Sequence, residues 1–72
     1  MTIQATGTAK LAIDLNLGDI IELDFEVYGK VTGLSINGSF SDLMTVTGLT
    51  LDGNKIKMGC LVDHVAHIYR TV

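Results

Sequence analysis

Apolar and polar residues alternate with a period of two along the chain from Ile3 to Val27. Apart from a break at Gly18-Asp19, the odd positions are apolar or small, and the residues between them are mostly polar or charged. Side chains of a β-strand point to opposite faces in turn, so the pattern predicts strands with one face on a core and one in water. A helix would repeat its apolar residues about every 3.6 positions instead. We therefore predict an all-β protein whose N-terminal segment is extended rather than helical.

Turn residues divide the chain into five or six short strands. Asn37-Gly38 and Asp52-Gly53 are pairs typical of hairpin turns, and Tyr28-Gly29 is expected to close an earlier hairpin. Gly33 lies inside a strand pattern, which predicts a bulge or a sharp bend. The predicted strands cover residues 5–15, 19–27, 30–36, 45–51, 55–62 and 65–71. Strands this short and bent predict a single domain over residues 1–72, folded as a small barrel.

The small size of the domain predicts that it assembles with further copies of itself. A domain of 72 residues buries only about 60% of the surface of its unfolded chain, which leaves its stability marginal. The single cysteine, Cys60, excludes an internal disulfide, and no thiolate-rich zinc site can form. The chain is 47% hydrophobic and has no proline to protect a strand edge. We expect strands 45–51 and 65–71 to be edges that pair between neighbouring subunits.

Charge and hydropathy exclude some partners. The net charge of −3 and the isoelectric point near 5.0 argue against tight, nonspecific binding of nucleic acid, although a local basic patch or stacking could still bind it. No segment is apolar enough to cross a membrane, and no secretory signal is visible. With its lone thiol, the chain is expected in the cytoplasm and away from membranes.

Candidate chemistry is sparse. Glu22, Asp24 and Glu26 put three carboxylates on one strand face, which is interpreted as a solvated face rather than a cation site. His64 lies at a predicted turn, where it could belong to a binding surface, and His67 is interpreted as an ordinary strand histidine. Neither histidine has a recognisable nucleophile or acid as its partner. We therefore expect neither an enzyme nor a cofactor.

The remaining candidates are interpreted as structural. Cys60 shares the parity of Ile56, Met58 and Val62, which predicts a buried thiol of low reactivity. Phe40 and Tyr69 are expected to be core or interface aromatics.

Residues 18–68 resemble the Sm/LSm family, including its bacterial Hfq branch. Gly18 opens a segment similar to the first family motif, Gly29 matches its turn glycine, and Gly33 matches its bend glycine. Leu61-Val62-Asp63-His64 is similar to the turn of the second motif, and the apolar pair Val65 and Ile68 follows it. The resemblance implies a strongly bent, five-stranded, SH3-like barrel and a homo-oligomeric ring of roughly five to seven subunits.

In that family single-stranded RNA binds at the pore, and the resemblance assigns this role to loop and turn residues. The matching positions in this chain are Phe40, Asp42, Met44, Asp63 and His64. Thr45 stands at the position of the family's RNA-contacting asparagine, and Leu61 and Val62 replace the arginine and glycine of its turn. Two functions therefore stay open: a ring that binds single-stranded RNA weakly, and a ring that serves as a scaffold or protein-interaction module without RNA. Similar short chains occur among viral sequences, so a phage accessory role could follow by analogy.

Overall fold

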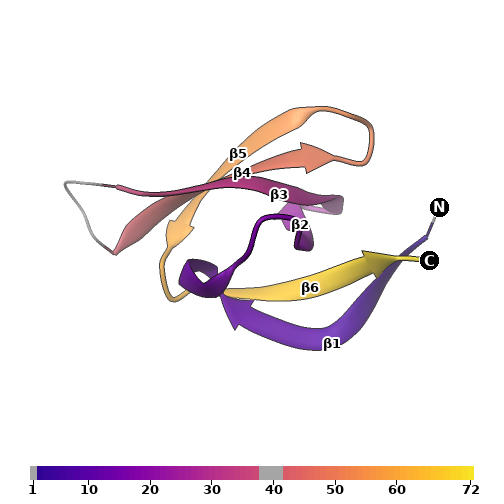
Figure 1. The fold of residues 1–72 in the computed structure, drawn as a ribbon, viewed down its shortest axis with the longest axis horizontal. Helices are drawn as coiled ribbons and strands as arrows, with labels where there is room; N and C mark the ends of the chain where they lie inside the picture. The colour runs from indigo at the N-terminus through magenta and orange to yellow at the C-terminus, as the bar shows by residue number, and fades with distance from the viewer. Residues whose placement is uncertain (1, 38–41) are drawn as a thin grey trace.

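The computed structural model describes residues 2–37 and 42–72, which form an all-β fold. Six antiparallel strands make one sheet in the order β1-β6-β2-β3-β4-β5 (Figure 1). The strands are β1 (Ile3–Leu11), β2 (Ile20–Asp24), β3 (Val27–Ile36), β4 (Leu43–Thr50), β5 (Lys55–Leu61) and β6 (Val65–Thr71). A short 3₁₀ helix, η1 (Ala12–Asp14), lies between β1 and β2. In the described part of the chain, no helix has the length and apolar character needed to cross a membrane.

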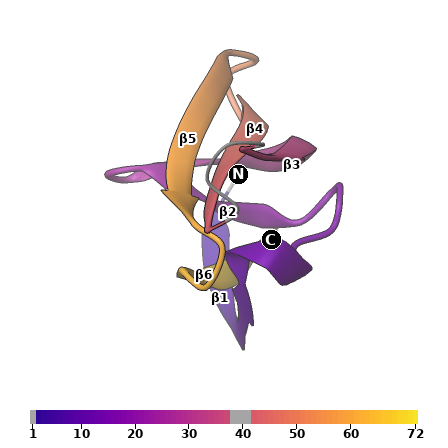
Figure 2. The same cartoon turned by 90° about the vertical axis from the view of Figure 1, so that its left-hand side faces the viewer.

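The sheet is open, which differs from the expected five-stranded barrel. The N-terminal segment forms a sixth strand that pairs with β6, so β1 and β5 become the two margins of the sheet and do not pair with each other (Figure 2). The two strands predicted to be edges are both internal. Strand β4 lies between β3 and β5, and β6 lies between β1 and β2.

Several local predictions are confirmed. The ladder between β3 and β4 shifts its register between Val31 and Gly33, as a bulge at this glycine requires. The chain turns at Asp52-Gly53, where Gly53 has a φ of 90° that an L side chain rarely adopts. Strand β6 has the predicted bounds, and β5 ends one residue early. Gly38 of the other predicted turn lies outside the described residues.

The hairpin turn between β2 and β3 was predicted in the wrong place. The chain turns at Phe25-Glu26, where Glu26 has a φ of 56° and donates its N–H to Glu22 Oε2 at 2.9 Å. Gly29 instead lies in the ladder opposite Ile21. It is needed there for space, since an added Cβ would lie 2.6 Å from Leu23 Cδ1 and 2.7 Å from the Leu49 carbonyl oxygen.

Strand β1 does not bury the apolar face that its alternation predicts. It ends at Leu11 rather than at residue 15, and its residues are exposed or half-exposed. Burial begins only where the chain leaves the strand, at Ala12 of η1 and at Leu15. Hydrogen bonds from Ala12 N to His64 O (2.8 Å) and from Ile13 N to Val62 O (3.0 Å) hold η1 against the β5–β6 turn.

The core lies mainly between β2, β3 and β4 and is small. Its buried hydrophobic residues are Ala12, Leu15, Ile21, Leu23, Val31, Met44, Val46 and Ala66. Cys60 packs against this cluster with Ile56, Met58 and Val62, as their shared parity predicted, although all four are only partly buried. Burial raises the pKa of the Cys60 thiol, which disfavours the reactive thiolate.

Candidate functional site

Three of the residues predicted to bind RNA lie together, where the chain enters β4 beside the β5–β6 turn. Val62 N donates to Asp42 O at 2.9 Å, which brings the end of the loop beside Asp63 and His64. The turn is held by a hydrogen bond from His64 N to Leu61 O at 3.0 Å. The structure therefore brings three of the five predicted residues together, and all three are exposed.

Of the other two predicted residues, the structure describes only Met44, which does not extend this surface. Phe40 lies outside the described residues. Met44 is 3% exposed and belongs to the core, with Ile36 opposite it on one side and Cys60 on the other. A base could stack on Met44 only if the core opened. Met44 shares the parity of Val46, which is fully buried, so the two side chains lie on the same face of β4.

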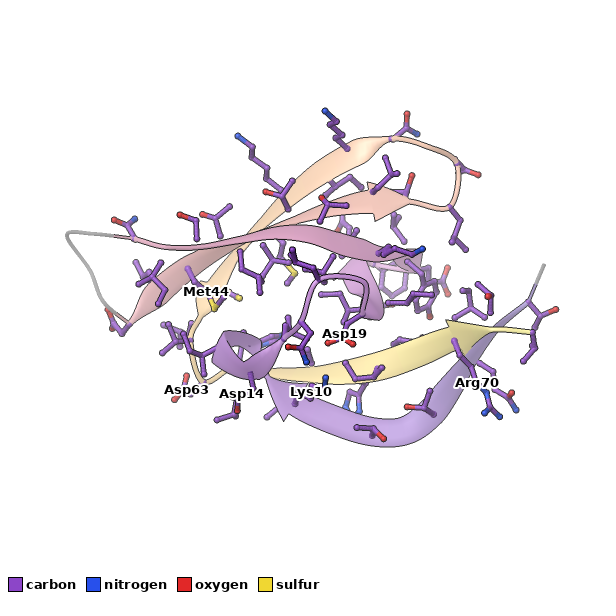
Figure 3. All side chains as sticks on the ribbon, in the orientation of Figure 1. Lys10, Asp14, Asp19, Met44, Asp63 and Arg70 are labelled. Carbon is purple, nitrogen blue, oxygen red and sulfur yellow. The ribbon has the colours of Figure 1, made fainter. Side chains whose placement is uncertain are left out.

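This end of the molecule is acidic. Asp14 of η1 lies near Asp63 (Figure 3), since Ile13 of η1 donates its N–H to Val62 O. Asp42 joins the same turn through its backbone oxygen, which accepts the Val62 N–H. Within residues 2–37 and 42–72, no three His, Cys, Asp or Glu side chains are grouped so that they could hold a metal ion. The exposed carboxylates at this end repel phosphate groups. No lysine or arginine on η1 or on the β5–β6 turn offsets their charge.

A shallow cleft of about 230 Å³ opens between β2 and β6. The two strands share only the residue pair Ile20 and Tyr69 and then separate. Apolar side chains of Ile21, Met58 and Ala66 line the cleft, together with Glu22, His64, His67 and Tyr69. Sequence reasoning had not connected Glu22 with the two histidines, since they lie on strands that are distant in sequence.

Two tyrosines meet beside this cleft. Tyr28 and Tyr69 pack edge to face with ring centroids 4.8 Å apart. Loss of hydration, together with the nearby Glu22 carboxylate, raises the pKa of Tyr28, so that its hydroxyl stays protonated and can donate hydrogen bonds. The cleft offers an apolar floor with a few polar groups at its rim, and it is too small to enclose a drug-sized ligand.

Comparison with known proteins does not extend this description: the chain matches no protein-family model, no curated protein and no solved structure.

Proposed function

We propose that this protein is a non-enzymatic scaffold that assembles from identical copies, and that the copies join through the free edge of β5. The observation that carries the proposal is the regular, unpaired edge of this strand. The β4–β5 ladder runs from Leu43 opposite Leu61 to Leu49 opposite Lys55 without a register shift. A regular edge of this kind presents backbone donors and acceptors to any strand that approaches it.

The hydrogen-bond pattern identifies the backbone groups on this edge. Val62 N donates to Asp42 O and Thr50 N donates to Asn54 O. The backbone hydrogen bonds between β4 and β5 are therefore made by the even-numbered residues of both strands. In an antiparallel pair the backbone groups of alternate residues point away from the partner strand. The N–H and C=O groups that point to the free edge are therefore those of Lys55, Lys57, Gly59 and Leu61.

Exposed apolar side chains support self-association. Twelve large hydrophobic residues of the described chain remain at least one-third exposed, although the core contains only eight buried hydrophobic residues. Some of these residues are direct neighbours across the sheet, Leu11 with Val65 and Leu43 with Leu61, and contiguous exposed apolar surface commonly marks an interface. The exposed residues are Leu11, Ile13, Leu17, Phe25, Leu34, Ile36, Leu43, Leu49, Leu51, Leu61, Val65 and Val72.

The expected assembly is a closed ring. One strand edge that binds a different surface of the next copy makes a head-to-tail contact, which generates a ring when the rotation between copies closes. The resemblance of residues 18–68 to the Sm/LSm family favours this closure, with roughly five to seven subunits.

The scaffold function is favoured over RNA binding at the pore. Asp14, Asp42 and Asp63 surround the turn that the resemblance assigns to RNA, and a ring would repeat these carboxylates in every subunit. Binding of a phosphate backbone depends on lysine and arginine near the phosphates.

Light scattering and sedimentation with two variants of Gly59 test the proposal. Its N–H points to the free edge, and an added Cβ would meet no atom within 4 Å. Gly59→Pro removes this edge donor and leaves the β4–β5 hydrogen bonds in place, so we expect a folded monomer. Gly59→Ala keeps the donor and should assemble like the wild type.

Three outcomes would contradict parts of the proposal. A wild-type mass equal to that of a monomer at every concentration would overturn self-assembly. A Gly59→Pro variant that assembles normally would exclude the β5 edge. Sub-micromolar binding of a random single-stranded RNA at physiological salt would reinstate the RNA function.

A further inference from the structure

Basic and acidic residues are segregated in this chain. Strands β3, β4 and β5 contain three of the four lysines and no aspartate or glutamate. All eight acidic residues lie elsewhere in the chain. The part of the sheet formed by β3, β4 and β5 is therefore basic, although the protein as a whole is acidic.

Two of these lysines flank an exposed leucine on the outer face of the sheet. Lys30 lies directly opposite Leu49, and Leu49 lies directly opposite Lys55, so the three side chains form one row across β3, β4 and β5. The row points away from the core, because the neighbouring Val31 and Gly48 are buried on the other face. Leu49 is 40% exposed. Since adjacent strands lie about 4.8 Å apart, the lysine Cα atoms are separated by roughly 10 Å.

The lysines of this basic row are available to a partner. In the described residues, the only ion pair joins Lys10 to Asp19 at 3.0 Å, and the Arg70 guanidinium bonds to Gln4. Lys30 and Lys55 are exposed and have no carboxylate within ion-pair distance among the residues that the structure describes.

The β2–β3 turn carries an exposed apolar side chain between two acidic residues, whereas the basic row carries one between two lysines. Phe25 is 83% exposed at the tip of the hairpin, between Asp24 and Glu26. The tip is held in shape by hydrogen bonds from Phe25 N to Asp24 Oδ1 (2.8 Å) and from Glu26 N to Glu22 Oε2 (2.9 Å). An aromatic side chain on a preformed turn loses little conformational entropy on binding.

We infer that the Asp24-Phe25-Glu26 tip of one copy docks on the Lys30–Leu49–Lys55 row of the next copy. The phenyl ring covers Leu49, and the two carboxylates face the two lysines, so that apolar and charged groups are matched together. This inference rests on the proposed self-assembly and adds a second contact to it. Lys55 belongs to β5, so the row borders the edge through which the copies join.

A second copy fits the basic row better than RNA does. The row contains no aromatic side chain on which a base could stack. The tip supplies an aromatic ring and negative charges, both of which the row lacks. RNA binding is therefore treated as an outcome of the test.

Charge reversal in two variants, measured by sedimentation at low and moderate salt, tests the contact. Lys30→Glu/Lys55→Glu and Asp24→Lys/Glu26→Lys should each weaken self-association at least about tenfold, because like charges then face each other. An equimolar mixture of the two should restore assembly, since each tip meets a row of opposite charge. Misfolding of either variant could not produce this rescue. Phe25→Ala should weaken association by a similar factor without changing the circular dichroism spectrum.

The outcomes separate this inference from the proposed function. Association of all three variants at wild-type strength would overturn the docking contact and leave the β5 edge intact. Failure of the mixture to assemble, with both variants folded, would also overturn it. Loss of RNA binding in the lysine variant, with self-association unchanged, would assign the row to RNA instead. A two-fold dimer that depends on Phe25 would keep the contact and exclude the ring, whereas a wild-type monomer at every concentration would exclude both.

Discussion

The two margins of the sheet, β1 and β5, differ in how closely their structure follows their sequence pattern. Strand β5 keeps a regular register, and its even-numbered side chains pack against the core. Strand β1 shows an equally clear alternation, yet it is exposed along most of its length. A period of two therefore predicts that a segment forms a strand. It does not predict whether other parts of the fold cover the apolar face of that strand.

The irregular pairing of β1 has a local cause. Its register with β6 shifts between Ala5 and Ala9, and Gly7 in this stretch has a φ of 83°. The Thr6 hydroxyl replaces a backbone donor by bonding to Ile68 O at 2.9 Å. A bulged edge of this kind is a poor template for a further strand, which leaves β5 as the more accessible edge.

The largest stability effect is expected between these margins, in the centre of the sheet. Gly29→Ala should destabilise the protein by about 3 kcal/mol, because the added Cβ would lie 2.7 Å from a backbone oxygen of Leu49 that cannot easily move. Gly59→Ala on β5 is the matched control, with an expected change within about 0.5 kcal/mol. Urea unfolding measures both. Equal costs at the two positions would mean that β3 and β4 are packed less closely than the structure indicates.

Truncation of apolar side chains compares the two margins directly. Met58→Ala on β5 should lower the free energy of unfolding by about 2 kcal/mol, because Met58 packs against the core. Leu11→Ala at the end of β1 should cost less than about 1 kcal/mol, because Leu11 is 40% exposed. The measurement is urea unfolding below the concentration at which the copies associate. A larger cost for Leu11→Ala would show that β1 is covered in solution, for instance by a neighbouring copy.

Two glycines distinguish the bulged margin from the regular one. Gly7→Ala should cost about 1 kcal/mol, since its φ of 83° is unfavourable for alanine, although the added Cβ meets no atom within 4 Å. Gly59→Ala has equal space without this backbone constraint. Thermal unfolding of both variants provides the comparison. Identical melting temperatures would indicate that β1 adjusts its backbone at no cost.

The smallest effect concerns the ion pair that ties the end of β1 to the segment before β2. Lys10 Nζ lies 3.0 Å from Asp19 Oδ2, which also accepts the Asn16 N–H at 2.9 Å (Figure 3). Burial opposes ionisation of Asp19, but these two hydrogen bonds and the lysine charge outweigh it and lower the pKa of the carboxyl. The stabilisation is therefore present above the unfolded-state pKa of about 3.9 and is lost as the pH falls through the lower, folded-state pKa.

Asp19→Asn should accordingly lower stability by up to about 1 kcal/mol at pH 7, and the difference from wild type should vanish in acid. Urea unfolding at neutral and acidic pH tests this dependence, with Asp14→Asn as the control for an exposed carboxylate. A difference that persisted unchanged in acid would mean that the ionised form of Asp19 is not what stabilises the fold.

The candidate site was predictable only in part. The break in the strand pattern at residues 63–64 predicted the β5–β6 turn. A backbone hydrogen bond from Val62 N to Asp42 O, which no sequence pattern predicts, brings Asp42 to this turn. The burial of Met44 depends on which face of β4 meets the core. The basic row was not predicted either, because its two lysines are brought together only by strand pairing across β4.

The sequence by itself determined the strand conformation, the bulge at Gly33, the turn at Asp52-Gly53 and the bounds of β6, because these depend on local periodicity and backbone preference. Only the tertiary structure decided that Gly29 is needed for close packing rather than for a turn, and that β1 pairs with the outer edge of β6. It also decided which margin of the sheet stays regular and free. These features depend on contacts between residues that are distant in sequence, and an alternating pattern carries no information about the strand that will lie beside it.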